Sequence, residues 1–140
     1  MVVVPAAATD ADIIVAVDGW VSLLEAGNYV AACEGVDSPP GGVWTPELIQ
    51  GCINGEWCDA PKDRQVTLAG LSRQFTINGR SFIQTQRREV DRSEPNDGGE
   101  LHEIWYDLNV DGVVSDLTVT FRLVRVSQGL LLRLYDICVR

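Results

Sequence analysis

Three apolar runs separated by two short turn sequences dominate the C-terminal part of the chain. The runs span residues 101–110, 115–126 and 130–139, and apolar and polar side chains largely alternate along them. The separators, Asp111-Gly112 and Ser127-Gln128-Gly129, consist of residues that favour turns. Because consecutive strands joined by short turns pair in opposite directions, this pattern predicts a three-stranded antiparallel meander.

The N-terminal part carries the signals of helices instead. Thr9 followed by Asp12 is typical of a capping box, and Gly27 is typical of a helix end. Between them, apolar residues recur at helical spacing and predict one long amphipathic helix. Residues 29–34 predict a short second helix, and Thr45-Pro46-Glu47 predicts the start of a third.

The middle of the chain contains one further turn signal. Phe75 to Phe82 is an apolar and polar stretch centred on Asn78-Gly79, which predicts a hairpin with a two-residue turn. A length of 140 residues suits one domain. We therefore predict a single α+β domain over residues 1–140, with the N-terminal helices packed on a curved antiparallel sheet.

The net charge of −9 is distributed unevenly along the chain. Residues 1–61 hold nine acidic residues and no Lys or Arg, whereas residues 62–140 hold eleven of each sign. Such a surface repels phosphate backbones, so we expect no nucleic-acid partner. It suits a basic protein partner, although acidic residues also simply keep a protein soluble.

We expect a cytoplasmic protein that does not interact with a membrane. No stretch approaches the roughly 18 apolar residues that a membrane helix needs. Met1 to Ala8 is apolar, but no basic residue precedes it and Thr9 and Asp10 end it, which makes a poor signal peptide.

The four cysteines and the single histidine give no metal or cofactor signal. None of the cysteines forms a Cys-x-x-Cys pair, and His102 is the only histidine, so we predict no metal and no cofactor. Cys52 and Cys58 are close enough in sequence for a small-loop disulfide, but a cytoplasmic location favours thiols.

The turns allow the register of the meander to be predicted. A two-residue turn at Asp111-Gly112 places Val110 opposite Val113, and it places Tyr106 opposite Leu117 and Ile104 opposite Val119. The same register places His102 opposite Phe121, and the second turn places Thr120 near Asp136 and Phe121 near Tyr135. One predicted face, to be covered by a helix, reads Ile104, Tyr106, Leu108, Leu117, Val119, Phe121, Leu123, Tyr135, Ile137 and Val139. The other reads Glu103, Trp105, Asp107, Asp116, Thr118, Thr120, Arg122, Leu132, Leu134, Asp136 and Cys138.

The second face mixes apolar and charged side chains. A patch of exposed Trp and Leu is unfavourable in water, while unpaired charges are unfavourable when buried, and a homodimer interface satisfies both demands. The alternatives are cover by another segment of the same chain, or an exposed surface. The predicted dimer interface consists of Trp105, Thr118, Thr120, Arg122, Leu134 and Asp136.

The order of these elements, with helices first and a meander last, resembles the NTF2-like (SnoaL-like, cystatin-like) superfamily. Trp20 to Tyr29, ending in Leu-Leu-Glu-Ala-Gly-Asn-Tyr, is similar to the end of the first helix in that superfamily. Ser115 to Thr118 and Asp136 to Val139 resemble strand ends of its small bacterial members. The resemblance implies a cone-shaped α+β fold. It does not imply one activity, because the superfamily includes isomerases, dehydratases, cyclases, transport adaptors and immunity proteins.

The catalytic groups that such enzymes need are not evident in the sequence. Isomerases of this type place a tyrosine and two aspartates inside the cone, and dehydratases use a His–Asp pair. The predicted face that a helix covers carries Tyr106, Tyr135 and, near its edge, His102, but no aspartate. His102 has the chemistry of a general base, but a histidine without partners is more often a rim residue.

We therefore expect a binding or interaction module rather than an enzyme. The predicted partners are a second copy of the chain, and either a small apolar ligand or a basic protein. The alternative is a small isomerase or dehydratase with a pocket between the first helix and the sheet, and a purely structural or regulatory domain is the third class. Aromatic residues explain a ligand pocket and a packed core about equally well. The predicted ligand-binding residues are Trp20, Tyr29, His102, Tyr106 and Tyr135.

Overall fold

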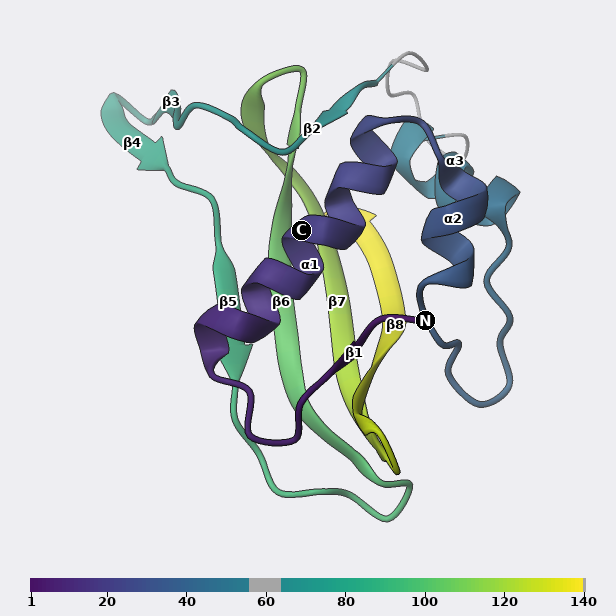
Figure 1. Ribbon diagram of the computed structural model, residues 1–140. Helices are drawn as coiled ribbons and strands as arrows, with labels where there is room; N and C mark the ends of the chain where they lie inside the picture. The colour runs from purple at the N-terminus through teal and green to yellow at the C-terminus, as the bar shows by residue number, and fades with distance from the viewer. Residues whose placement is uncertain (56–63, 140) are drawn as a thin grey trace.

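The computed structural model describes residues 1–55 and 64–139 (Figure 1). It confirms the α+β class and has a strongly curled antiparallel half-barrel sheet. The helices are α1 (Asp10–Glu25), α2 (Tyr29–Glu34) and α3 (Pro46–Asn54). The strands are β1 (Val3–Val4), β2 (Val66–Thr67), β3 (Arg73–Ile77), β4 (Arg80–Gln84), β5 (Arg88–Asp91), β6 (Glu100–Val110), β7 (Val113–Val126) and β8 (Gly129–Val139).

The predicted meander forms the centre of the main sheet. Its strand order is β1-β8-β7-β6-β2, and β5 also pairs with β6. β3 and β4 form a separate two-stranded sheet, the hairpin predicted around Asn78-Gly79. α1 lies across one face of the main sheet, which we call the inner face, and the opposite face is the outer face (Figure 1).

The helices begin and end at the predicted residues. The Asp12 amide donates to Thr9 Oγ1 at 3.2 Å and the Thr9 amide to Asp12 Oδ2 at 3.0 Å, which completes the capping box. Gly27 adopts a positive φ of 71° just after α1, as a glycine at a helix end does. Thr45 caps α3, with proline in its first turn. The face of α1 that the sequence marked as apolar is buried, through Ile13, Val17, Trp20, Val21 and Leu24.

The predicted register holds next to the first turn and then fails. Val110 pairs with Val113, but residues 115–117 of β7 then lie opposite Leu108 alone. The Ser115 hydroxyl donates to the Leu108 carbonyl at 2.7 Å and stabilises this bulge. Beyond the bulge, Tyr106 pairs with Val119, not with Leu117, and Ile104 pairs with Phe121, not with Val119.

A second bulge lies at His102, which was predicted to face Phe121. No residue of β7 pairs with His102, and its φ is 52°, in the left-handed region. The backbone of His102 is therefore out of line with the ladder. The prediction that His102 continues the alternation of β6 is wrong.

A third bulge, at Tyr135, changes which side chains of β8 face the helix. Thr120 pairs with Asp136 as predicted, but Phe121 pairs with Leu134. Because one inserted residue reverses the facing of the side chains beyond it, Leu132 and Leu134 lie on the inner face, both buried. The prediction that these leucines belong to the outer face is wrong, and Leu134 is not available to a dimer interface.

Candidate functional site

The space between α1 and the sheet is filled by side chains. Trp20 meets Phe121 edge to face, with ring centroids 5.2 Å apart, and its Nε1–H donates to the Ala32 carbonyl at 2.8 Å. Both rings are buried, together with Ile104 and Leu123 of the sheet. Trp20, predicted to bind a ligand, is thus a core residue whose polar atom already has a partner.

Tyr106 lies in the same core, and its hydroxyl already has a hydrogen-bond partner. It donates to Asp18 Oδ1 at 2.6 Å, and Arg88 forms an ion pair with the other oxygen of Asp18. Burial, followed by the neighbouring Asp18 carboxylate, raises the pKa of Tyr106 far above its ordinary value. The Asp18–Tyr106–Arg88 cluster therefore holds α1 to β6 and β5, and its tyrosine is unsuited to releasing a proton near neutral pH.

His102 connects β6 to the loop before it. Its Nδ1 accepts from the Ser93 amide at 3.1 Å, and its Nε2 lies 3.2 Å from the Arg92 guanidinium. Burial and the charge of Arg92 lower the pKa of His102. Both ring nitrogens face N–H groups, so the neutral ring is favoured. Arg92 itself forms an ion pair with Asp10 at 2.6 Å, and the Asp10 carboxylate is therefore bound to Arg92 and not to His102.

Tyr135 belongs to a polar network on β8. Its hydroxyl donates to Glu100, which also accepts from Arg133 at 2.9 Å. Arg133 in turn donates to Asp37 at 2.7 Å. Burial alone would raise the pKa of Glu100, but the hydrogen bonds and the charge of Arg133 outweigh it and lower that pKa.

The predicted ligand-binding residues do not gather around one cavity. Trp20 and Tyr106 are core residues, and His102 and Tyr135 belong to the separate networks described above. Tyr29 is half-buried at the start of α2, and burial raises its pKa. Among these five residues, Tyr135 lines a small hollow of about 190 Å³, together with Trp44 and Leu48.

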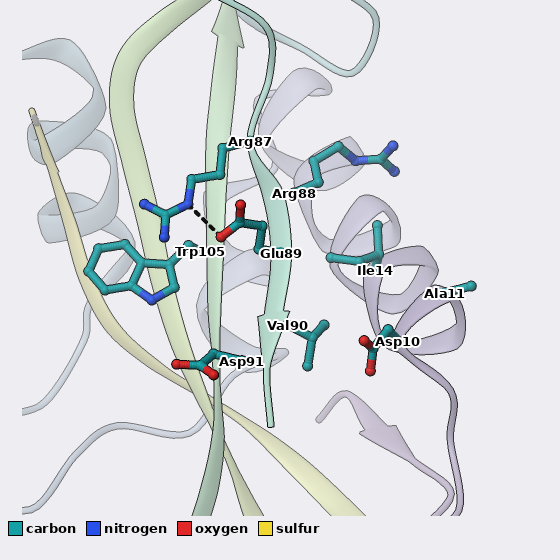
Figure 2. Close-up of a pocket in the computed structure, with 9 residues that line it drawn as sticks. All are labelled: Asp10, Ala11, Ile14, Arg87, Arg88, Glu89, Val90, Asp91 and Trp105. Atoms are coloured by element: carbon teal, nitrogen blue, oxygen red, sulfur yellow. Dashed lines mark hydrogen bonds and ion pairs between the residues drawn. The ribbon is translucent and has the colours of Figure 1, made fainter. Parts of the chain in front are cut away.

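A groove of about 580 Å³ lies along β5, and Trp105 is the one predicted site residue among those that line it. Figure 2 looks onto this strand, with Trp105 on one side of it and Ile14 of α1 on the other. Its volume falls within the roughly 300–1,000 Å³ typical of binding pockets. The lining residues are Asp10, Ala11, Ile14, Arg87, Arg88, Glu89, Val90, Asp91 and Trp105.

One long side of β5 has no strand beside it. In the described part of the chain, β5 pairs with β6 alone. The Asp107 amide donates to the Arg87 carbonyl at 2.8 Å, so Arg87 is a residue whose backbone groups face β6. In an antiparallel pair, every second residue turns its N–H and C=O away from the partner strand. These residues in β5 are Arg88 and Val90, whose peptide groups therefore point into the groove.

The arginines of the groove are already paired with acidic residues. Arg87 pairs with Glu89 at 2.9 Å and lies over the Trp105 ring at 4.7 Å, while Arg88 pairs with Asp18. Asp91 is exposed and has no cationic partner among the described residues. The groove thus offers a free carboxylate and no free arginine, which favours a basic ligand.

Several polar side chains on the outer face of the sheet have hydrogen-bond or ion-pair partners within the chain. Thr118 donates to Asp107 at 2.9 Å, Arg122 pairs with Glu103 at 3.1 Å, and Trp105 is covered in part by Arg87. Thr118 and Thr120 are buried, and Asp136 lies opposite Thr120. With Leu132 and Leu134 on the inner face, the outer face keeps only Trp105 of the three apolar residues on which the dimer prediction rested.

Neither similarity to a known protein nor a cluster of metal ligands assigns a function to the described residues. The chain matches no model of a known protein family, no curated protein and no solved structure. Within residues 1–55 and 64–139, no three His, Cys, Asp or Glu side chains gather as metal ligands, and no helix is long and apolar enough to cross a membrane. Cys58, a candidate for pairing with Cys52, lies outside the described residues.

Proposed function

We propose that this protein is a protein-interaction module that binds an extended segment of its partner along β5. The observation that carries this proposal is the free edge of β5, which lies within a groove of 580 Å³ between α1 and Trp105. Extended peptides add to such edges as an extra strand, because the unpaired backbone groups form main-chain hydrogen bonds with them.

The two sides of the groove select different side chains. Alternate residues of an added strand face opposite sides, so one set meets Ile14 and Ala11 of α1, and the other meets Glu89, Asp91 and Trp105. The first side favours small apolar residues and the second favours basic ones. The partner segment therefore alternates apolar and basic residues, in agreement with the acidic net charge of the chain.

The order of the elements and the curled sheet support an NTF2-like domain as part of this proposal. The filled space between α1 and the sheet gives a small apolar ligand no room there and favours a binding module over the isomerase or dehydratase alternative. Self-association remains part of the proposal. The outer sheet face is less suited to a dimer interface than the sequence predicted, since Leu134 is buried and Thr118 is hydrogen-bonded to Asp107.

Replacing Val90 with proline tests the edge directly. Proline removes the N–H that points into the groove and leaves the hydrogen-bonded residues Glu89 and Asp91 of the β6 ladder in place. A fluorescein-labelled peptide of alternating valine and lysine is expected to bind the native protein with a dissociation constant on the order of 10–100 micromolar. We expect Val90→Pro to weaken binding about tenfold, the effect of one lost backbone hydrogen bond.

Two controls separate this effect from others. Val90→Ala shortens the side chain but keeps the N–H, so its affinity is expected to stay within about threefold of the native value. A peptide of alternating valine and glutamate is expected not to bind, because it meets the acidic side of the groove. Equal binding of the lysine peptide by Val90→Pro and native protein, measured by fluorescence anisotropy, would exclude β5 as the site.

A further inference from the structure

The β3–β4 hairpin is an arm that extends away from the body (Figure 1). Its turn residues, Asn78 and Gly79, both have positive φ, 51° and 77°, as a tight two-residue hairpin turn requires. The base is fastened to β7, where Arg73 pairs with Asp116 at 2.8 Å and Gln84 donates to the Ser115 carbonyl at 3.1 Å. From Gln74 to Ile83 every residue is exposed.

One face of this arm is apolar. Phe75 and Phe82 are cross-strand partners with stacked rings, and Ile77 continues the same face toward the turn. Their exposed fractions are 37%, 43% and 53%, respectively. A two-stranded hairpin is marginally stable by itself in water, and exposed aromatic clusters mark interaction sites. The arm therefore has the properties of a contact element.

The arm is also the basic part of an acidic chain. Residues 73–84, which form the arm, include two arginines and no acidic residue, whereas residues 1–55 include seven acidic residues and no Lys or Arg. Arg80, beside the turn, has no carboxylate partner among the described residues. The charge of the arm thus complements the helical half of another copy of the same chain.

The helical half contains a hollow that fits the tip of the arm. Its volume is about 190 Å³, which is below the roughly 300 Å³ of the smallest typical ligand pockets and suits one or two apolar side chains. Glu47 adjoins the lining residue Leu48 in sequence. Glu34 directly follows Cys33, whose thiol donates to the carbonyl of the lining residue Trp44 at 3.2 Å. Both exposed carboxylates therefore lie near the hollow, which is lined by Pro39, Gly42, Val43, Trp44, Leu48 and Tyr135.

We propose that the β3–β4 arm of one copy docks into this hollow of a second copy. Ile77 beside the turn enters the hollow, the stacked Phe75 and Phe82 contact its rim, and Arg80 faces the carboxylate of Glu47. When each copy inserts its arm into the other, the two contacts are related by a twofold axis and the assembly closes as a dimer. This surface is separate from the groove along β5, so either proposal can fail without the other.

Charge reversal at the two ends of the contact tests the docking by sedimentation velocity of the full chain. Arg80→Glu and Glu47→Arg are each expected to raise the dimer dissociation constant about tenfold or more. When the two variants are mixed, the heterodimer has one native contact and one contact with both charges exchanged. We therefore expect the mixture to dimerise within about threefold of the native protein.

A substitution to the same residue type on the other face of the arm provides the control. Gln74→Glu changes the charge of the arm by one unit, away from Phe75 and Phe82, and is expected to leave dimerisation within about threefold of native. Circular dichroism of each variant establishes that it is folded. A monomeric native protein at about 100 micromolar, a dimer that Arg80→Glu does not weaken, or variants whose mixture stays monomeric would each overturn the proposal.

Discussion

Replacing Trp20 with alanine is expected to lower the free energy of unfolding by about 3–5 kcal/mol. The indole is buried between α1 and the sheet, packs edge to face on Phe121 and donates its N–H to Ala32. The substitution leaves a cavity that the surrounding side chains cannot fully close, and it removes one partner of the Ala32 carbonyl. Urea denaturation followed by circular dichroism measures the loss.

Val15→Ala is the matched control on the same helix. Val15 is exposed on α1, so its truncation creates no cavity and is expected to change stability by less than about 0.5 kcal/mol. If Trp20→Ala is too unstable to fold, Trp20→Phe keeps most of the ring and is expected to lose about 1–3 kcal/mol. A loss below about 1 kcal/mol for Trp20→Ala would contradict a filled core, and would reopen the possibility of a ligand pocket there.

Replacing Arg133 with methionine is expected to lower the free energy of unfolding by about 3 kcal/mol. Arg133 bridges Glu100 at 2.9 Å and Asp37 at 2.7 Å, and only 15% of its side chain is exposed. Methionine fills a similar volume, so the main effect is that the nearly buried Glu100 loses its cationic partner. The network joins the segment after α2 to the start of β6 and the middle of β8.

Arg125→Met is the control for this change, because Arg125 is exposed on β7 and has no ion-pair partner among the described residues. It is expected to stay within about 0.5 kcal/mol of native. Adding Glu100→Gln to Arg133→Met removes the unpaired charge and is expected to recover part of the loss. Equal stabilities of Arg133→Met and Arg125→Met in thermal or urea unfolding would show that the network contributes nothing.

Local signals in the sequence predicted the elements well, because those signals act on neighbouring residues. Thr9 with Asp12, and Thr45 before proline, position hydrogen-bond acceptors at helix starts whatever the rest of the chain does. Asn78-Gly79 and Asp111-Gly112 supply consecutive residues with positive φ where hairpins need them. The helices, the hairpin and the meander followed from such features.

The bulges were not predictable in the same way. The bulge opposite Leu108 depends on the Ser115 hydroxyl, and those at His102 and Tyr135 coincide with bonds to Ser93 and Glu100. These contacts join residues whose proximity the sequence does not show. Because one inserted residue reverses the alternation, the bulge at Tyr135 places Leu134 in the core and takes Tyr135 off the inner face. Neither placement could be predicted without knowing of the bulge.

The groove was not predicted from the sequence because β5 has no alternation of apolar and polar residues. Val90 is the one apolar residue between Arg87 and Asp91, so no period of two was visible. The strand forms because β6 offers it a partner, and the groove exists because nothing in the described chain covers its other edge. The uneven charge was visible in the sequence, and it contributed the basic partner to the proposed function.

Amide hydrogen exchange by NMR, residue by residue along β5, tests the central claim most directly. In the free protein, the amides of Arg88 and Val90 are expected to exchange fast, and those of Glu89 and Asp91 to be protected by β6. Adding the valine–lysine peptide is expected to slow exchange at Arg88 and Val90 about tenfold or more at saturation. If the peptide binds and protects amides elsewhere while the exchange rate of Val90 stays the same, β5 is not the binding edge.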